Sequence, residues 1–244
     1  MQLHVETRGS GPVRIALVHG FLGDGSLWTD VVAASDSERF TFLLVDLRGH
    51  GASPRADPAA GERYDVASMA ADLVETLPTD LDAIVGHSLG GRVIADAVGA
   101  LRPRRAVYLD PGFGLRLPRS GVAGALFWRI PGLARLLVWA YDRADSATGE
   151  ANVALVEAAH RVWDRSMVAD LLHDVAVHPV APAPPVVPST LVLSDDGKLV
   201  VPSADLRRFA ELGWDLLRMR GIRHDVLLLD GPRTARVIRE AVGA

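Results

Sequence analysis

The stretch DAIVGHSLGGRV, residues 82–93, constrains the fold more than any other part of the sequence. A short apolar run leads directly into Gly86, Ser88 and Gly90, and helical spacing follows. Glycines on both sides of a serine let the chain turn tightly from a strand into a helix, because larger side chains would collide there. The pattern predicts a serine at the carboxyl end of a buried strand and beside the amino end of a helix.

Short apolar runs alternate with helical patterns on both sides of this turn. This alternation is typical of a mainly parallel sheet that is covered by helices. The N-terminal segment around His4 is expected to form a first strand or hairpin. The further strands are expected at residues 14–20, 41–45, 82–86, 106–109, 190–196 and 224–230. The helices are expected at residues 26–35, 64–77, 91–101, 203–221 and 233–244.

Residues 112–181 interrupt the alternation, because this part of the sequence contains only helical patterns. We therefore predict an α/β fold with a doubly wound, mainly parallel sheet, formed by residues 1–111 and 182–244. The helical cap, residues 112–181, is inserted after the strand that follows the helix after Ser88. The most apolar stretch, residues 121–141, contains charged residues and a proline, so it predicts two short helices rather than a membrane span.

The composition narrows the functional classes. A chain of 244 residues that is 49% hydrophobic can bury one sizeable core. A net charge of −4 without long runs of one sign argues against a nucleic-acid surface. The sequence has no cysteine, which excludes disulfides, thiolate metal sites and a cysteine nucleophile. We expect no metal and no cofactor, no membrane or nucleic-acid partner, and, because no signal peptide is evident, a cytoplasmic location.

Three segments together resemble the α/β-hydrolase superfamily: LVHGF at residues 17–21, VDLRGHGAS at 45–53 and GHSLG at 86–90. They come in the order and at the spacing typical of that superfamily. The resemblance is strong over residues 1–110 and extends to the layout alone over residues 190–244. It implies that Ser88 is a nucleophile, and that the backbone N–H groups of Phe21 and Leu89 form an oxyanion hole.

The resemblance also implies an acid and a histidine that follow the serine along the chain. The acid has two candidate positions. Asp196 lies in the loop LVLSDDGKLVVP, although the usual position falls on Gly197 or Lys198, depending on the alignment. Asp110 ends the strand after the Ser88 helix, where some members of the superfamily carry the acid. Each aspartate could instead only hold a turn.

The histidine of the superfamily follows the last strand, but the segment LLLDGPRTARV, residues 227–237, contains none. His224 lies at the opposite end of the strand expected at residues 224–230. A strand rises about 3.3 Å per residue, which places His224 roughly 20 Å from the active edge of the sheet. His224 can therefore serve Ser88 only if this strand assignment is wrong.

The remaining histidines divide into two groups. Those within the matched motifs, His19, His50 and His87, are expected to pack or to make structural hydrogen bonds. Those in the cap could reach Ser88 from above as a general base, namely His160, His173 and His178. The cap is also rich in aromatic residues, which favours an apolar chamber and a hydrophobic small-molecule substrate. The expected pocket residues are His19, Phe113, Trp128, Trp139 and Trp163.

Three functions follow from these observations. The first is a serine hydrolase that acts on a hydrophobic ester, lactone or thioester, and this is the function that we expect. The second is a cyclase, lyase or isomerase on the same fold, which uses the oxyanion hole without a full Ser-His-Asp triad. The third is a ligand-binding protein that has kept the pocket without the chemistry. The missing histidine keeps the second and third functions open.

Overall fold

The computed structural model describes residues 1–115, 127–128, 130, 132–133, 136, 149–195 and 200–243. These residues form a seven-stranded sheet in the order β1-β3-β2-β4-β5-β6-β7. Strand β1 is antiparallel to β3, and every other neighbouring pair is parallel, so the carboxyl ends of β2 to β7 meet at one edge. The strands are β1 (Val5–Gly9), β2 (Val13–Val18), β3 (Phe40–Val45), β4 (Ala83–His87), β5 (Arg105–Leu109), β6 (Ser189–Leu193) and β7 (Asp215–Arg218).

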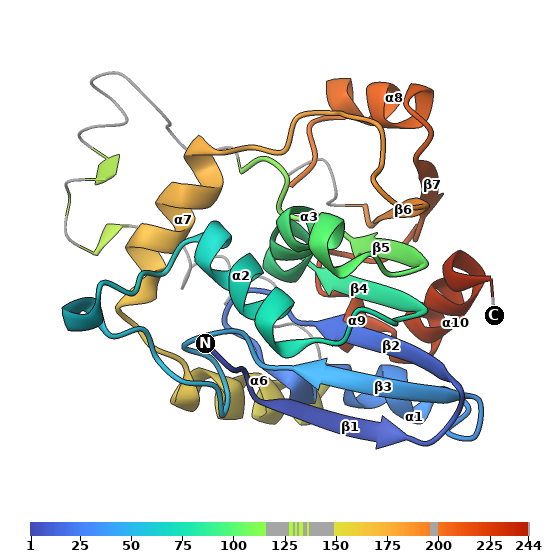
Figure 1. The fold of residues 1–244 in the computed structure, drawn as a ribbon, viewed down its shortest axis with the longest axis horizontal. Helices are drawn as coiled ribbons and strands as arrows, with labels where there is room; N and C mark the ends of the chain where they lie inside the picture. Colours follow the sequence, from blue (N-terminus) through green and yellow to red (C-terminus); the bar gives the residue numbers. More distant parts are fainter. Residues whose placement is uncertain are drawn as a thin grey trace.

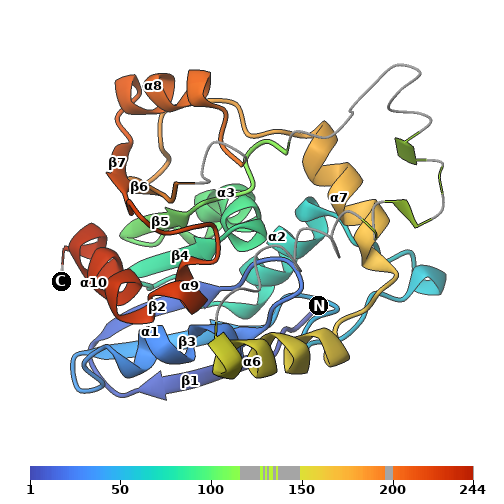
Figure 2. The same cartoon turned by 180° about the vertical axis from the view of Figure 1, so that it is seen from behind.

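Helices cover both faces of the sheet. Helices α2 and α3 lie on the face that Figure 1 presents, whereas α1, α9 and α10 lie on the face that Figure 2 presents. The predicted doubly wound α/β architecture is therefore confirmed. The helices are α1 (Thr29–Ala33), α2 (Val66–Thr76), α3 (Leu89–Leu101), α6 (Gly149–Val162), α7 (Met167–Val177), α8 (Ser203–Glu211), α9 (Val226–Leu229) and α10 (Gly231–Val242), and two short 3₁₀ helices are η1 (Gly25–Trp28) and η2 (Pro58–Ala60).

Strand β2 shows why the sheet has an apolar core on each face. Side chains alternate along a strand, so a run of apolar residues is buried on both sides. Ala16 and Val18 belong to the core beneath α2 and α3. Ile15 and Leu17 belong to the core beneath α1 and α10. The buried, uninterrupted apolar run is what the sequence pattern of a central parallel strand predicts.

The C-terminal part differs from the prediction at two elements. The helix expected at residues 203–221 is the helix α8 followed by the strand β7. Gly213 ends α8 with a φ of 95°, a conformation that residues with a side chain rarely adopt. The strand expected at residues 224–230 is the short helix α9. Its apolar run packs into the core beneath α1 and α10 instead of joining the sheet.

The described part of the region 112–181 is helical in α6 and α7, as the sequence predicts. It is joined to the loop before α2 by hydrogen bonds. The N–H of Asp164 donates to the carbonyl of Gly49 at 2.7 Å, and the hydroxyl of Tyr64 donates to the Asp164 carboxylate at 2.7 Å. We propose that residues 112–181 form the cap. Most of residues 121–141 lie outside the described residues. Within the described residues, no helix is long and apolar enough to cross a membrane.

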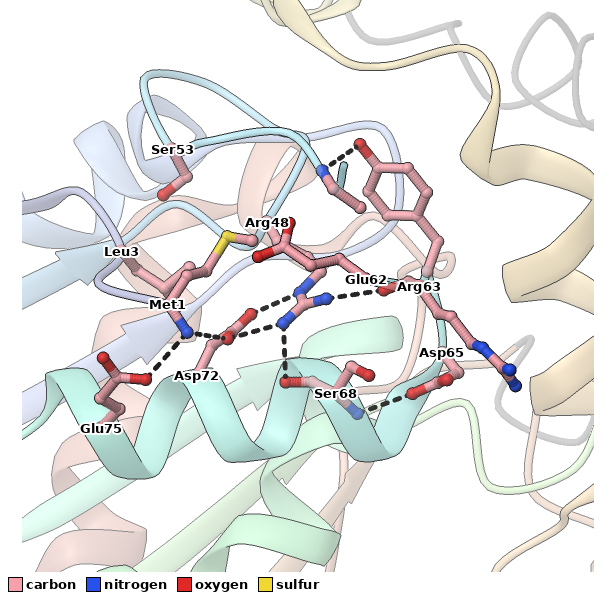
Figure 3. A network of polar contacts seen from close by, with 12 residues as sticks. Met1, Leu3, Arg48, Ser53, Glu62, Arg63, Asp65, Ser68, Asp72 and Glu75 are labelled. Atoms are coloured by element: carbon pink, nitrogen blue, oxygen red, sulfur yellow. Dashed lines mark hydrogen bonds and ion pairs between the residues drawn. The ribbon is translucent and has the colours of Figure 1, made fainter. Parts of the chain in front are cut away.

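A buried ion pair joins the loop after β3 to helix α2 (Figure 3). The Arg48 guanidinium donates from Nη2 to Asp72 Oδ1 at 2.7 Å and from Nε to Asp72 Oδ2 at 2.5 Å. The two side chains are only 7% and 1% exposed. Arg48 also donates to the carbonyl of Arg63 at 2.7 Å. The pair therefore holds the DLRGHG segment against α2.

Replacing Asp72 with alanine should lower the free energy of unfolding by about 3–5 kcal/mol. The substitution leaves the Arg48 guanidinium buried without its counter-ion, which is the costly way to break such a pair. Urea unfolding followed by circular dichroism measures the change. Glu75→Ala is the matched control on the same helix, because Glu75 is half-exposed and a surface carboxylate contributes less than about 1 kcal/mol. Equal stabilities of the two variants would contradict the account.

Candidate active site

Ser88 lies on a sharp turn between β4 and α3. Its backbone has φ 50° and ψ −112°, so a residue with a side chain is held in a region that normally favours glycine. The N–H of Ser88 donates to the carbonyl of Leu109 at 3.0 Å, and the N–H of Gly112 donates to the Ser88 carbonyl at 2.8 Å. Neighbouring strand β5 thus fixes the strained turn, and the predicted strand–serine–helix geometry is present.

The glycines of this turn allow the end of β2 to approach closely. A Cβ atom on Gly90 would lie 2.3 Å from the carbonyl oxygen of Val18, and a Cβ on Gly20 would lie 3.2 Å from the Ser88 Cβ. Phe21 is the next residue after Gly20, and Leu89 is the first residue of α3. The two expected oxyanion residues are therefore the sequence neighbours of Gly20 and Ser88, one in the loop after β2 and one at a helix end whose first N–H groups have no partner within the helix.

His224 contacts the Ser88 hydroxyl. Its Nε2 lies 2.9 Å from Ser88 Oγ, and the residue is 5% exposed. The predicted separation of roughly 20 Å is wrong, because it assumed about 3.3 Å of rise per residue along a strand that does not form. His224 instead lies in the loop that follows β7, the last strand of the sheet. This is the position that the resemblance to the superfamily implies for the histidine.

Asp110 contacts the opposite side of the His224 ring. Its Oδ2 lies 3.3 Å from His224 Nδ1, and its side chain has no exposed surface. Asp110 follows the end of β5 and has a positive φ of 41°. The backbone N–H of Ser194 donates to Asp110 Oδ1 at 2.7 Å, and the Ser194 hydroxyl donates to Oδ2. The alternative acid, Asp196, lies outside the described residues.

The loop that carries His224 is tied to the end of β6. The N–H of Met219 donates to the carbonyl of Leu193 at 2.8 Å, and the N–H of Gly221 donates to the Asp195 carboxylate at 2.8 Å. The N–H of Asp195 donates in turn to the carbonyl of Ile222 at 2.9 Å. The sequence gives no indication of the roles of Ser194 and Asp195, because both lie within the strand expected at residues 190–196, whereas β6 ends at Leu193.

Two of the expected pocket residues are corrected, because burial leaves them no surface for a substrate. His19 has 0% exposure, donates from Nδ1 to the Gly20 carbonyl at 2.7 Å, and accepts at Nε2 from the N–H of Leu47 at 3.0 Å. Burial lowers its pKa below the ordinary value. Phe113 is 1% exposed, and the centroid of its ring lies 5.5 Å from the centroid of the Tyr108 ring in the core.

The tryptophans of the region 112–181 have different positions. Trp163 is half-buried, and the centroid of its ring lies 6.3 Å from the centroid of the Phe21 ring, so it is close to an expected oxyanion residue. The half-buried Trp128 ring lies 4.9 Å from the His173 ring. Trp139 lies outside the described residues. Of the expected pocket residues that keep exposed surface, Trp163 is therefore the one whose ring lies beside Phe21.

Metal binding has one candidate group in the part of the chain that the structure describes. Donor atoms of His87, His224 and Asp225 lie within 4.8 Å of one another. The two ring nitrogens of His224 already contact Ser88 and Asp110. A metal ion would have to displace these contacts. The geometry is that of a hydrogen-bonded chain of side chains, and we propose no metal or other cofactor for it.

Two buried histidines predict that the protein loses stability in mild acid. Burial lowers the pKa of His50 and of His87 to about 3, from an ordinary value of 6.5. Below pH 6.5 the unfolded chain therefore binds protons that the folded chain does not, and this favours unfolding. Between pH 6.5 and pH 3, each histidine should lower the free energy of unfolding by about 1 kcal/mol per pH unit.

Urea unfolding at pH 7.0, 6.0 and 5.5 tests this expectation. Stability should be constant above pH 7 and should fall as the pH drops through this range. His50→Gln removes one of these titrating groups, so the decrease should be shallower in this variant. His178→Gln is the control, because His178 is exposed. A His50→Gln variant as acid-sensitive as the wild type would argue against the assignment.

The sequence was compared with models of protein families. The family model described as the alpha/beta hydrolase family matches residues 15–237. The chain belongs to the alpha/beta hydrolase family. Among solved structures, the enol-lactonase from Burkholderia xenovorans LB400 is similar with a TM-score of 0.74 at 20% identity, over 99% of this chain and 96% of that chain. At this identity the likeness shows the alpha/beta hydrolase fold alone.

Curated relatives in the alpha/beta hydrolase family match over shorter segments. An uncharacterized protein of Mycobacterium tuberculosis is 47% identical over 90 residues, which are 35% of this chain and 24% of that protein. A pimeloyl-(acyl-carrier protein) methyl ester esterase of Chromobacterium violaceum is 40% identical over 93 residues, which are 38% of this chain and 34% of the esterase. The matches therefore span about a quarter to a third of the length of these relatives.

Proposed function

We propose that the chain is a serine hydrolase with Ser88 as nucleophile, His224 as general base and Asp110 as the acid. The observation that carries the proposal is the continuous chain of contacts: 2.9 Å from Ser88 Oγ to His224 Nε2, and 3.3 Å from His224 Nδ1 to Asp110 Oδ2. Asp110 is fully buried and already accepts two hydrogen bonds from Ser194. Its carboxylate can therefore fix the orientation of the imidazole.

This arrangement supports the two-step chemistry of acyl transfer. The Nδ1–H group of His224 donates a hydrogen bond to the Asp110 carboxylate, so the Nε2 lone pair is free to take the proton of the Ser88 hydroxyl. The Ser88 oxygen attacks the carbonyl carbon, and the backbone N–H groups of Phe21 and Leu89 stabilise the oxyanion. His224 then protonates the leaving group. In the second step His224 takes a proton from water, which attacks the acyl-enzyme carbonyl. His224 then returns the proton to Ser88 Oγ as the bond between the acyl carbon and Ser88 breaks, and the free serine is restored.

The contact between His224 and Ser88 favours this function over the two alternatives. A cyclase, lyase or isomerase stays open on the sequence alone, because no histidine is expected beside the serine. A non-catalytic binding protein stays open for the same reason. A base within hydrogen-bond distance of the nucleophile, with a buried carboxylate behind it, is the arrangement that activates a serine. The proposed reaction takes its nucleophile and base from the chain and calls for no cofactor.

We propose a hydrophobic small-molecule ester, lactone or thioester as the substrate. The half-buried Trp163 ring beside Phe21 supports an apolar group near the reacting carbonyl. The names of two similar proteins fit the same chemical class, since one is a methyl ester esterase and the other an enol-lactonase. Both names describe reactions at a carbonyl carbon, which is what an oxyanion hole beside a serine serves.

Hydrolysis of nitrophenyl esters tests the proposed function. The wild type should hydrolyse at least one member of a series from acetate to octanoate, together with matched lactones and acyl thioesters. The specificity constant kcat/KM should rise from acetate to a longer acyl chain, because each CH₂ group that is buried on binding contributes about 0.8 kcal/mol of favourable free energy. Ser88→Ala is the control for background hydrolysis. The proposal would be contradicted if the folded wild type hydrolysed none of the esters, lactones and thioesters faster than this background.

A further inference from the structure

His87 lies between Gly86 and Ser88 at the carboxyl end of β4, and no step of the proposed reaction uses its side chain. The residue is 4% exposed. Its Nε2 lies 3.0 Å from the backbone carbonyl oxygen of His224. Because a carbonyl oxygen can only accept a hydrogen bond, Nε2 must carry the proton and donate it. The residue next to the nucleophile thus holds the backbone of the base.

The protonation state of His87 suits this role. Burial lowers the pKa of its imidazole to about 3, and the neighbouring His224 ring lowers it in the same direction. The ring is therefore neutral near pH 7, with its one proton on Nε2. Among the described residues none donates to Nδ1. Nδ1 faces Gly20, where a Cβ atom would lie 2.9 Å away, so a side chain at position 20 would displace the ring.

Three other anchors of the loop lie before His224 in the sequence. Met219, Gly221 and Ile222 are held by the end of β6 and the residues after it. The His224 carbonyl itself has two donors, the N–H of Val226 at 2.8 Å and the His87 ring. Val226 belongs to the same segment as His224. Of these contacts, only the bond from His87 links the backbone of His224 to the strand that carries Ser88.

We propose that His87 is a positioning residue, which sets the distance between His224 Nε2 and the Ser88 hydroxyl by donating from its own Nε2 to the His224 carbonyl. The inference rests on the proposed function of Ser88 and His224. The two rings lie side by side, with centroids 5.0 Å apart, so a shift of one is transmitted to the other. A misplacement of about 1 Å in a reacting group can lower the rate about 100-fold.

Two conservative substitutions separate positioning from general structure. The amide nitrogen of glutamine can reach the place of Nε2, whereas that of asparagine reaches only the place of Nδ1. Both side chains are neutral, so the local charge is unchanged. His87→Asn should lower kcat for ester hydrolysis about 10- to 100-fold with KM within about twofold of the wild type. His87→Gln should retain kcat within about threefold. Equal kcat values in the two variants would overturn the proposal.

Hydrogen exchange tests the contact without any substrate. Residues 219–225 should exchange faster in His87→Asn than in the wild type and in His87→Gln, while β4 and β5 keep their protection. The same exchange in all three proteins would overturn the proposal. If His87→Asn fails to fold, His87→Met replaces it, because methionine fills the space without a donor. A folded wild type that lacks Ser88-dependent turnover would overturn the proposed function instead, and the exchange rates would still decide whether His87 holds the loop.

Discussion

Replacing His224 with alanine is expected to lower kcat for ester hydrolysis by about 10⁴- to 10⁶-fold, with little change in the fold. The imidazole is the group within hydrogen-bond distance of Ser88 Oγ, at 2.9 Å. Without it the hydroxyl keeps its proton and is a poor nucleophile. Members of such a triad act as a unit, so removal of one costs nearly as much as removal of all. Steady-state kinetics on a nitrophenyl ester measures the effect.

The cap histidines supply the matched controls. His160→Ala and His173→Ala remove two of the three imidazoles that, from the sequence, could reach Ser88 from above. In the structure, the His160 ring lies 6.4 Å from that of Trp163, and the His173 ring contacts Trp128. Each substitution should change kcat by less than about tenfold. A larger loss in either variant than in His224→Ala would assign the base to the region 112–181 and contradict the triad.

Replacing Asp110 with asparagine is expected to lower kcat by about 10⁴-fold, as loss of the carboxylate does in serine hydrolases with this geometry. Asparagine has the same size, but its amide NH₂ group can donate to His224 Nδ1. The imidazole then carries its proton on Nε2 and cannot accept the proton of Ser88. The substitution also removes the negative charge that stabilises the imidazolium. Kinetics at saturating substrate separates this loss in kcat from any change in KM.

Asp196→Asn is the control for the alternative acid. It should leave kcat within about tenfold of the wild type, since the His224 ring is held by Asp110 at 3.3 Å. Circular dichroism shows whether Asp110→Asn folds, because Asp110 also accepts two hydrogen bonds from Ser194. A large loss of kcat in Asp196→Asn, combined with normal kcat in Asp110→Asn, would assign the acid to the loop after β6.

The sequence predicted strands β2 to β5 well, because each contains a run of apolar residues between turn residues. The turn at Ser88 was predicted from three independent signals, namely a strand before it, glycines around it and a helix after it. Two C-terminal elements, those expected at residues 203–221 and 224–230, were predicted wrongly, because short apolar runs do not distinguish a strand from a buried helix. The segment 226–229 is a helix, and residues 215–218 are the strand. Gly213 was the available signal that α8 ends before β7.

This exchange of a strand for a helix also explains why the sequence predicted a long distance between His224 and Ser88. The distance expected between His224 and Ser88 depended entirely on which C-terminal segment forms the last strand. The choice between Asp110 and Asp196 depended on which strand end approaches His224. That approach is set by the hydrogen bonds of Ser194 and Asp195 across β5, β6 and the last loop. Such contacts between distant segments carry no periodic pattern in the sequence.

Reaction with a fluorophosphonate probe tests the central claim most directly, because the probe modifies a serine whose hydroxyl is activated by a base. Mass spectrometry of the peptide that contains Ser88 locates and counts the modification in wild type, Ser88→Ala and His224→Ala. The account predicts one phosphonyl group per wild-type chain on Ser88, none in Ser88→Ala, and labelling at least about 10³-fold slower in His224→Ala. A folded wild type that is not labelled, or His224→Ala labelled as fast as the wild type, would contradict the account.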